Sequence, residues 1–250
     1  MSHPIFPRTA LVTGASQGLG RDIARRLAAA GHRVAVNYFS SSSAAAATVA
    51  AIRDAGGVAE AVCADVRDPA QVAALVAETT RLLGSPDIIV HNATGPQPMK
   101  PLEAYAWKDF QDQLDFFVKA PVLLTQATLA GLKQARWGRI ILIGSEVVDL
   151  GNSSFSAYVA AKAAMVGLTR AWATEFGPWQ ITVNLVAPGW IPVERHAGTS
   201  PDALTSYAAA VPLQRQGTPA DIAAAVAYLA SEEAGFVTGQ CLAVNGGNTF

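Results

Sequence analysis

Hydrophobic residues along this 250-residue chain fall into short continuous runs that alternate with longer, alanine-rich segments. Because the short runs are rich in β-branched residues and lie between turn-forming residues, they predict strands. They are apolar throughout rather than alternating with polar residues, so we expect a sheet that is covered on both faces. The expected strands are residues 9–13, 33–38, 58–63, 88–91, 139–144, 182–186 and 240–244.

The longer segments have helical spacing, and three of them end at Gly31, Gly56 and Gly84, where a left-handed cap is expected. The expected helices are residues 20–30, 44–55, 70–83, 107–134, 157–176 and 219–230. Alternating strands and helices require right-handed crossovers. The pattern therefore predicts the α/β class: one Rossmann-like, doubly wound parallel sheet of about seven strands with helices on both faces.

The chain contains no linker, repeat or low-complexity tract that would divide it, so we expect a single domain over residues 1–250. Its one long irregular segment is residues 188–218. Connections of this length are usually lids or binding loops. We therefore expect residues 188–218 to form a mobile flap over a substrate.

Composition narrows the function classes. With 51% hydrophobic residues, 15% charged residues and a net charge of −1, the chain can form a large core but offers no basic surface for nucleic acid or an anionic membrane. No apolar run is long enough to cross a membrane, and residues 1–8 lack the apolar stretch of a signal peptide, so we expect a cytoplasmic protein. Cys63 and Cys241 lie in apolar runs, which predicts buried free thiols, and the scattered histidines predict no metal site.

Residues 9–20 have the order strand, glycine turn, helix. Glycines at 14, 18 and 20 would let the backbone approach a pyrophosphate, whose charge then meets the amides at the start of the helix. The spacing G-x-x-x-G-x-G differs from the more familiar G-x-G-x-x-G, but its place at the first strand–helix junction favours a dinucleotide site. The residues expected there are Gly14, Ser16, Gln17, Gly18, Leu19 and Gly20.

The second strand ends at Asn37-Tyr38-Phe39-Ser40, without the carboxylate that often holds an adenosine ribose. Since a carboxylate would repel a 2′-phosphate, its absence favours NADP(H) and leaves NAD(H) open. Tyr38 and Ser40 are expected beside the adenosine, and serines 40–42 could donate hydrogen bonds to the phosphate. However, this loop has no lysine or arginine that could neutralise the charge of the 2′-phosphate.

Three further residues predict a reaction centre. Ser145 follows an apolar run and so lies at the carboxyl end of a strand, where open α/β sheets bind ligands. Tyr158 and Lys162 have the spacing i, i+4, which places them on one helix face. An ammonium beside a phenol favours the phenolate, and a second hydroxyl could hold a carbonyl against it. The set suits proton transfer coupled to hydride transfer.

In sequence order, these motifs resemble those of the short-chain dehydrogenase/reductase family, especially bacterial 3-oxoacyl-acyl-carrier-protein reductases. The resemblance runs from Thr9 to Gly247. Its motifs are the glycine turn at 13–20, Cys63-Ala-Asp-Val66, His91-Asn-Ala-Thr94, the interval from Ser145 to Tyr158, and Pro188-Gly189.

The resemblance implies a role for each matching residue. Tyr158 would be the acid/base, Ser145 would orient the carbonyl, and Lys162 would lower the pKa of Tyr158 and bind the nicotinamide ribose. Further cofactor contacts would come from Asp65, Val66, Asn92, Ala93, Pro188, Gly189 and Ile191. Val147, Phe155 and Trp190 are weaker candidates for substrate contacts. The resemblance also implies a homotetramer, or a dimer.

We therefore expect an NAD(P)H-dependent oxidoreductase that interconverts a carbonyl and a secondary alcohol. Acyl thioesters, β-keto esters, sugars and steroid-like ketones all stay open as substrates. An enoyl reductase is disfavoured, because relatives with that activity are expected to have a wider Tyr–Lys interval than 158 to 162.

Three positions depart from the family pattern. Phe117 stands where the family usually has an asparagine, which provides the alternative of a catalytically impaired dinucleotide-binding protein. Thr94 replaces a glycine, although Gly95 is adjacent, and Val193 replaces a threonine near the cofactor.

Overall fold

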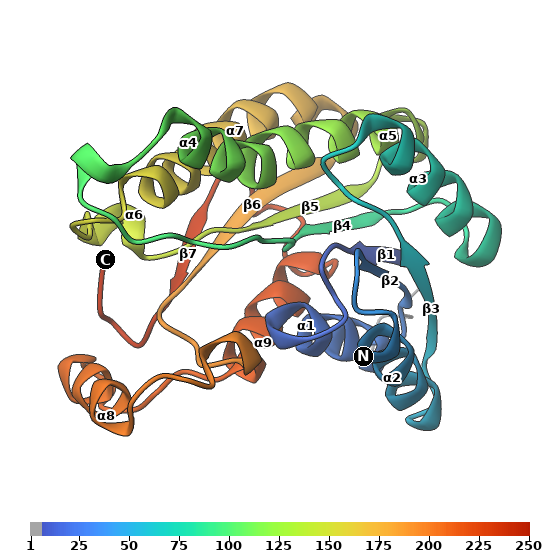
Figure 1. Ribbon diagram of the computed structural model, residues 1–250. Coiled ribbons are helices and arrows are strands. Elements are labelled where there is room, and N and C mark those ends of the chain that lie inside the picture. The colour runs from blue at the N-terminus through green and yellow to red at the C-terminus, as the bar shows by residue number, and fades with distance from the viewer. Residues whose placement is uncertain (1–6) are drawn as a thin grey trace.

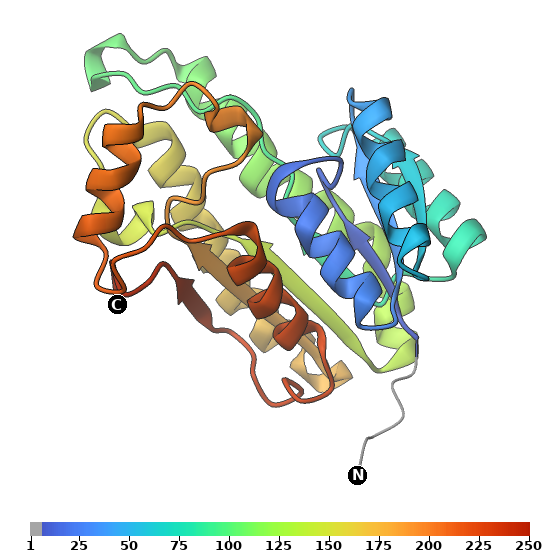
Figure 2. The same cartoon turned by 90° about the horizontal axis from the view of Figure 1, so that it is seen from below.

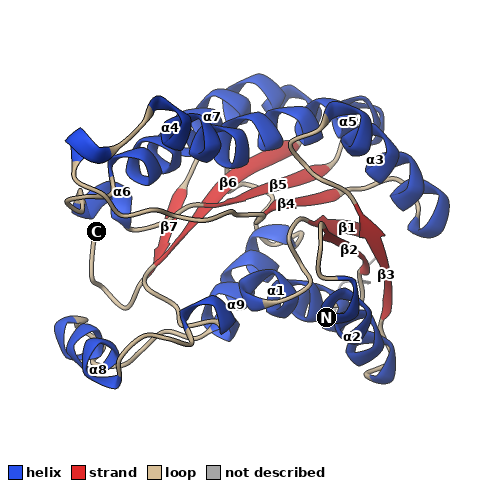
Figure 3. Cartoon of the chain, in the orientation of Figure 1, coloured by secondary structure: helices blue, strands red, loops and turns tan. Residues whose placement is uncertain are grey.

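The computed structural model describes residues 7–250 and has a seven-stranded parallel sheet between two helical layers (Figures 1 and 3). The strand order is β3-β2-β1-β4-β5-β6-β7, so the predicted doubly wound α/β class is confirmed. The strands are β1 (Thr9–Val12), β2 (Arg33–Tyr38), β3 (Val58–Cys63), β4 (Ile88–His91), β5 (Gly138–Ile143), β6 (Ile181–Pro188) and β7 (Cys241–Val244).

Each face of the sheet has its own apolar core. Neighbouring residues of a strand point to opposite faces, so Val12 packs in one core and Leu11 in the other. In Figures 1 and 2, one face is covered by α1 (Gly18–Ala29), α2 (Ser42–Asp54) and α9 (Pro219–Ala230). The other is covered by α3 (Pro69–Leu83), α4 (Trp107–Leu114), α5 (Ala120–Ala135) and α7 (Ser156–Phe176).

Local sequence explains where several helices begin. Asp68 precedes α3, and its side chain accepts a hydrogen bond from Gln71 N at 2.9 Å; Thr218 caps α9 in the same way through Asp221 N. In both helices the first residue is a proline, which loses no hydrogen bond at that position. Short 3₁₀ turns lie at Leu102–Ala104 and Gly177–Trp179.

The single helix expected at 107–134 is instead two helices joined by a π-helix, Asp115–Lys119. Pro121, in the first turn of α5, has no N–H to donate, so a regular α-helical hydrogen-bond ladder cannot continue through it. A π-helix is common at functional sites because its wider turn redirects side chains. Here it turns Phe117 into the core.

The predicted flap is more ordered than its sequence indicated. It contains a 3₁₀ turn, Glu194–His196, and α8 (Pro201–Ala210), which stands apart from the two helical layers (Figure 2). A further short helix, α6 (Val147–Leu150), follows β5. Neither α6 nor α8 was predicted, because α6 has only four residues and neither helix has a buried apolar stripe.

The prediction of buried thiols is wrong: Cys63 and Cys241 are both exposed. They lie on β3 and β7, the two edge strands, where one side of the sheet has no neighbour. An apolar run cannot by itself distinguish a central strand from an edge strand. Across residues 7–250, none of the helices has the length and apolar character needed to span a membrane.

Candidate active site

The predicted site residues gather at the carboxyl edge of the sheet. The glycine turn follows β1, Asn92 follows β4, Ser145 follows β5, and Pro188 ends β6. Parallel strands β1, β4, β5 and β6 are consecutive neighbours, so these four segments adjoin. This edge, where the strand order reverses, is the usual ligand crevice of open α/β sheets.

The glycine turn has no room for side chains. Gly14 and Gly18 have φ values of 60° and 58°, which L residues rarely adopt. A Cβ on Gly14 would lie 2.9 Å from Ala93 Cα, and one on Gly20 would collide with Gly14 O and Asn92 Nδ2. The three glycines are therefore required by the backbone path itself.

Asn92 and Thr13 join the turn to β4. Asn92 Nδ2 donates to Thr13 O at 2.9 Å and to Gly14 O at 3.1 Å. In return, Thr13 Oγ1 accepts from the amides of Asn92 and Ala93 at 2.9 and 3.0 Å. Asn92 thus supports the turn from beneath. Thr13 was not among the expected site residues, although its place directly before Gly14 was a signal for it.

The start of α1 fits the diphosphate of a dinucleotide. Gln17 is the N-cap residue but its side chain makes no capping hydrogen bond, so the first amides of α1 are left to another acceptor. These amides face a turn whose glycines leave a cradle that Cβ atoms would fill. Ser16 is held from behind, where its carbonyl accepts from Thr48 Oγ1 at 3.0 Å, and Leu19 packs partly into the core.

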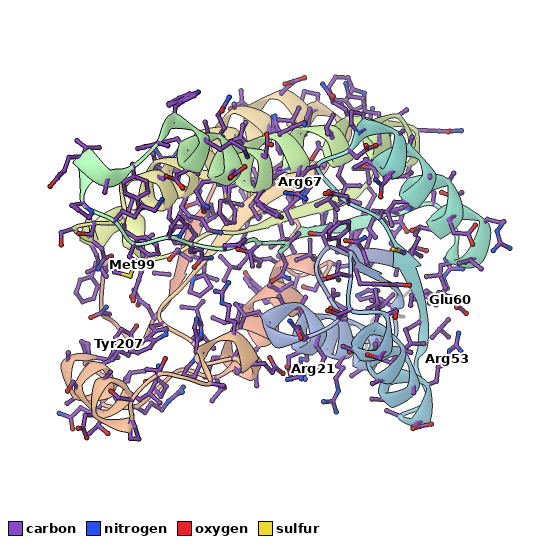
Figure 4. The ribbon with its side chains drawn as sticks, viewed as in Figure 1. Arg21, Arg53, Glu60, Arg67, Met99 and Tyr207 are labelled. Atoms are coloured by element: carbon purple, nitrogen blue, oxygen red, sulfur yellow. The ribbon has the colours of Figure 1, made fainter. Side chains whose placement is uncertain are left out.

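At the expected adenosine end, the structure adds a cation that the sequence did not indicate. Tyr38 is half-buried, Ser40 is exposed and Val66 is buried. Arg67 donates to both oxygens of Asp65 at 2.9 and 2.7 Å, and this bond is the main cause that lowers the pKa of Asp65. The guanidinium also lies 4.5 Å from the centroid of the Phe116 ring (Figure 4 labels Arg67).

Tyr158 and Lys162 lie together on α7, as expected. Both are buried, at 7% and 4% exposure, and Lys162 Nζ lies 5.5 Å from the centroid of the Tyr158 ring. Lys162 Nζ donates to Ile143 O at 2.6 Å, which anchors the ammonium to the end of β5. Ser145, half-buried two residues later, accepts from Val147 N at 3.4 Å.

The pKa of Tyr158 is shifted in the direction opposite to the expected one. Burial raises it, and this outweighs the charge of Arg195 and the polar groups of Ser145 and Gln97, which act to lower it. Burial also lowers the pKa of Lys162 well below its ordinary value, and Arg195 adds to this shift. The phenol therefore keeps its proton at neutral pH, as a proton donor to a carbonyl oxygen must.

Aromatic rings enclose this centre. Phe155 stacks on Tyr158 with ring centroids 4.7 Å apart, which places this candidate substrate contact beside the phenol. Phe117 meets Tyr158 edge-on at 5.4 Å, and its ring face lies 3.9 Å from Lys162 Nζ. The contact of Phe117 with both residues joins the π-helix to α7. The sequence identified Phe117 only as a departure from the asparagine that the family usually has.

The flap is attached to the serine loop through a buried carboxylate. Glu146, next to Ser145, accepts from Tyr207 Oη of α8 at 2.8 Å and from Asn248 Nδ2 at 3.0 Å. Tyr207 Oη accepts in turn from Trp190 N at 2.8 Å. Burial, together with the Glu146 carboxylate, raises the pKa of Tyr207 to about 12. Trp190 is thus held against α8 by its backbone and by an edge-on contact between its ring and Tyr207.

A second part of the flap lies on the glycine turn. A Cβ on Gly18 would be 3.6 Å from Val193 Cβ and 3.7 Å from a carboxylate oxygen of Glu194. Glu194 also forms an ion pair with Arg21 of α1, which Figure 4 labels. Burial alone would raise the pKa of Glu194, but the amides of Glu194 and Gly18 and the Arg21 guanidinium lower it overall. A carboxylate therefore lies at the start of α1, in the same anion-binding surroundings as the proposed phosphate site.

The remaining expected residues lie at the same edge. Ile191 is buried, and a Cβ on Gly189 would approach Tyr207 Oη at 2.5 Å. Gly95 is closely packed against the Phe116 ring, so it supplies the small residue that Thr94 does not. Within residues 7–250, no group of three or more His, Cys, Asp or Glu side chains is placed to hold a metal ion.

The chain is similar to known proteins over nearly its full length. A family model described as enoyl-(acyl carrier protein) reductase matches residues 14–249. The 3-oxoacyl-[acyl-carrier-protein] reductase of Staphylococcus aureus strain Mu50 is 38% identical over 242 residues, covering 96% of this chain and 97% of that protein.

Solved structures agree with this. A short-chain dehydrogenase/reductase variant from Serratia marcescens is 34% identical with a TM-score of 0.89, covering 99% of this chain and all of that one. A blue fluorescent protein from a metagenomic library, in complex with NADPH, is 36% identical with a TM-score of 0.88, covering 97% of this chain and 98% of that one. The alternative of a catalytically impaired protein finds no support among these relatives.

Proposed function

Because this chain belongs to the short-chain dehydrogenase/reductase family, and so is an NAD(P)H-dependent oxidoreductase acting on carbonyl and CH–OH groups, we propose that it reduces 3-oxoacyl thioesters with NADPH. The observation that carries the reaction type is the convergence of Ser145, Tyr158 and Lys162 beside the glycine turn. The thioester is favoured by the identity to a 3-oxoacyl-[acyl-carrier-protein] reductase over 96% of the chain.

When bound beside these residues, a nicotinamide would supply the hydride that the carbonyl carbon receives. Tyr158 Oη donates a proton to the carbonyl oxygen, and Ser145 Oγ donates a hydrogen bond to the same oxygen. Burial raises the pKa of Tyr158, so the phenol is present in its donor form at neutral pH. Lys162 Nζ, anchored on Ile143 O, holds positive charge beside the phenolate that remains after the proton has moved.

The family description names an enoyl reductase, but the carbonyl reaction is better supported. Tyr158 and Lys162 are four residues apart on one helix, and the phenol lies beside Phe155 with the serine loop next to it. A serine hydroxyl paired with a phenol suits an oxygen that gains negative charge at the reacting centre. We therefore keep reduction of a ketone as the proposed chemistry.

For the cofactor we propose a preference for NADPH over NADH. The residues at the start of α2 offer the exposed Ser40 and Ser42 and the half-buried Ser41, with no carboxylate at the end of β2. Arg67 lies at the same end, 6.0 Å from the Phe39 ring, and is paired with Asp65. The serine hydroxyls favour a 2′-phosphate through hydrogen bonds.

Assembly and location are also proposals. The edge strand β7 leaves Cys241 and Leu242 exposed and one row of backbone groups without a neighbouring strand. Such an edge is readily covered by a second chain, so we propose a homotetramer or dimer, testable by light scattering after gel filtration. The cytoplasmic location expected from the sequence stays a prediction.

The test combines binding and turnover. Thermal unfolding with NADPH or NADH at equal concentration should show a larger rise in Tm with NADPH, because a ligand stabilises the state that binds it. Loss of NADPH absorbance with acetoacetyl-CoA should then follow, and the Tyr158→Phe variant should lose it while still binding NADPH. If Tyr158→Phe kept full turnover, the proposed reaction centre would be wrong. No turnover of acetoacetyl-CoA by an enzyme that reduces other ketones would overturn only the substrate.

A further inference from the structure

Lys162 lies in surroundings that do little to stabilise its charged form. The side chain is 4% exposed, and Ile143 O is its one hydrogen-bond acceptor among the residues described. None of the ion pairs within residues 7–250 includes it. A buried ammonium with a single carbonyl partner is costly, because it has three N–H donors and has lost its water.

The ring face of Phe117 is the second group that meets this ammonium. Lys162 Nζ lies 3.9 Å from the centroid of the ring, well within the distance of a cation–π interaction. The Tyr158 ring is more distant, at 5.5 Å. Because the site is desolvated, the attraction between the ring and the cation is stronger than it would be at the surface.

The local backbone is built to present this ring. Phe117 is the middle residue of the π-helix Asp115–Lys119, and it is only 2% exposed. Its edge also packs on Tyr158, with an interplanar angle of 76°. One aromatic side chain therefore contacts both ionisable residues of the reaction centre.

Phe117 also borders a small cavity. The cavity beside Phe117 is lined by His91, Ala93, Phe116 and Met165, among others, and its volume is about 10 Å³. That is near the lower limit for a single water molecule. His91 Nε2 forms a hydrogen bond with Thr125 Oγ1 at 3.1 Å. Burial lowers the pKa of His91 to about 3, so its ring is neutral at pH 7 and adds no charge.

We propose that Phe117 is a positioning residue, whose ring face holds the Lys162 ammonium against Tyr158 and takes the place of a polar partner. The inference rests on the proposed function in assigning Tyr158 and Lys162 to the reaction. The other groups that act on the ammonium are the Tyr158 phenol on the same helix and the Arg195 guanidinium on the flap. Neither is negative at neutral pH, so the ring and Ile143 O are the groups that favour the charged form.

The experiment measures the pKa of Lys162 directly. Protein labelled with ¹³C at lysine Cε is titrated by NMR, and the Lys162 signal is assigned by its absence from Lys162→Met. Phe117→Leu keeps an apolar side chain but removes the π face, and it should lower the pKa of Lys162 by about one unit. Phe176→Leu is the matched control, because Phe176 is equally buried on α7 but about 20 Å along the helix axis from Lys162.

A second variant separates the loss of the π face from a change in packing, which Phe117→Leu could also cause. Trifluorophenylalanine at position 117 keeps the ring and its shape but weakens the negative face, so it should shift the Lys162 pKa in the same direction by a smaller amount. In kinetics, the loss of kcat/KM at high pH should move to lower pH in both variants, since less of the lysine is charged. An unchanged Lys162 titration in both variants would overturn the inference.

The two proposals fail in different ways. If Lys162→Met reduced the ketone as well as the unmodified protein, the proposed catalytic role of Lys162 would be wrong, whatever the NMR result. If Lys162→Met were inactive while both Phe117 variants kept the original Lys162 pKa, the reaction centre would stand and only the role of Phe117 would fall.

Discussion

The glycine turn and the reaction centre lie at one edge of the sheet but are stabilised by opposite means. The turn is a polar structure in which Asn92 and Thr13 exchange hydrogen bonds with the backbone, and it excludes side chains from the cradle. The reaction centre is aromatic and dry, with Lys162 held by one carbonyl and one ring face.

This difference agrees with the role proposed for each region. Backbone amides at the start of a helix bind a diphosphate well. Glycines let the diphosphate approach these amides, because they have no side chain in the way. A proton donor needs a titratable group whose pKa is set by burial and neighbouring charge. The flap connects the two regions, since Glu194 lies on the turn while Glu146, next to Ser145, holds Tyr207.

The largest expected effect separates catalysis from binding. Ser145→Ala should lower kcat for ketone reduction by about 10²-fold, because a hydrogen bond to the developing oxyanion is lost. The Kd for NADPH should change less than about twofold, as Ser145 lies outside the glycine turn. Stopped-flow kinetics measure kcat, and fluorescence titration measures the Kd for NADPH. Ser153→Ala, at an exposed serine, is the control. Equal losses in kcat and affinity would mean that the two regions are not independent.

The reverse pattern is expected for the turn. Gly20→Ala forces a Cβ onto Gly14 O and Asn92 Nδ2, so we expect a loss of about 1–3 kcal/mol in the free energy of unfolding and at least about a tenfold rise in the Kd for NADPH. Gly167→Ala, in an exposed position of α7 with open space around its Cβ, should instead gain about 0.5–1 kcal/mol. Chemical denaturation measures the free energy of unfolding of both variants. A Gly20→Ala protein as stable as Gly167→Ala would contradict the packing of the turn.

A smaller effect is expected where the flap meets the turn. Glu194→Gln removes a negative charge beside the start of α1, so NADPH should bind about 3- to 10-fold more tightly at low salt. The gain should shrink as salt is added, because exposed charges are screened. Glu175→Gln, an exposed residue of α7, makes the same change in net charge and should leave the Kd unchanged. Weaker binding by Glu194→Gln would show that the carboxylate assists the cofactor.

The smallest effect concerns the attachment of the flap. Burial and Glu146 raise the pKa of folded Tyr207 to about 12, whereas an unfolded tyrosine ionises near pH 10. Between these values the unfolded state releases the proton first, so stability is present below about pH 10 and is lost as the pH rises toward 12. Denaturation of Tyr207→Phe over this range should show a shallower loss of stability. An identical slope in both proteins would mean that Tyr207 ionises normally.

Some of the molecule was predictable because it depends on contacts within one element or one turn. The class of fold agrees with the prediction. All seven strands begin and end within two residues of the predicted runs, and six of them within one residue. The glycines at 14, 18 and 20 lie where the motif placed them. The spacing of Tyr158 and Lys162 placed both on one face of α7. In each case the number of residues per turn or per strand fixes the relation.

Other features required the packing of segments that are distant along the chain. The exposed Cys63 and Cys241, the contact of Phe117 with Lys162, the cation of Arg67 at the adenosine end and the place of Glu194 on Gly18 all depend on which elements are neighbours. The raised pKa of Tyr158 belongs here as well, since it reflects how completely other elements exclude water from the phenol. The sequence by itself determined where the glycine turn and the Tyr158–Lys162 pair lie, because local geometry depends on short spacing. Only the tertiary structure decided how those residues are charged, since electrostatic energy depends on distance and burial in three dimensions.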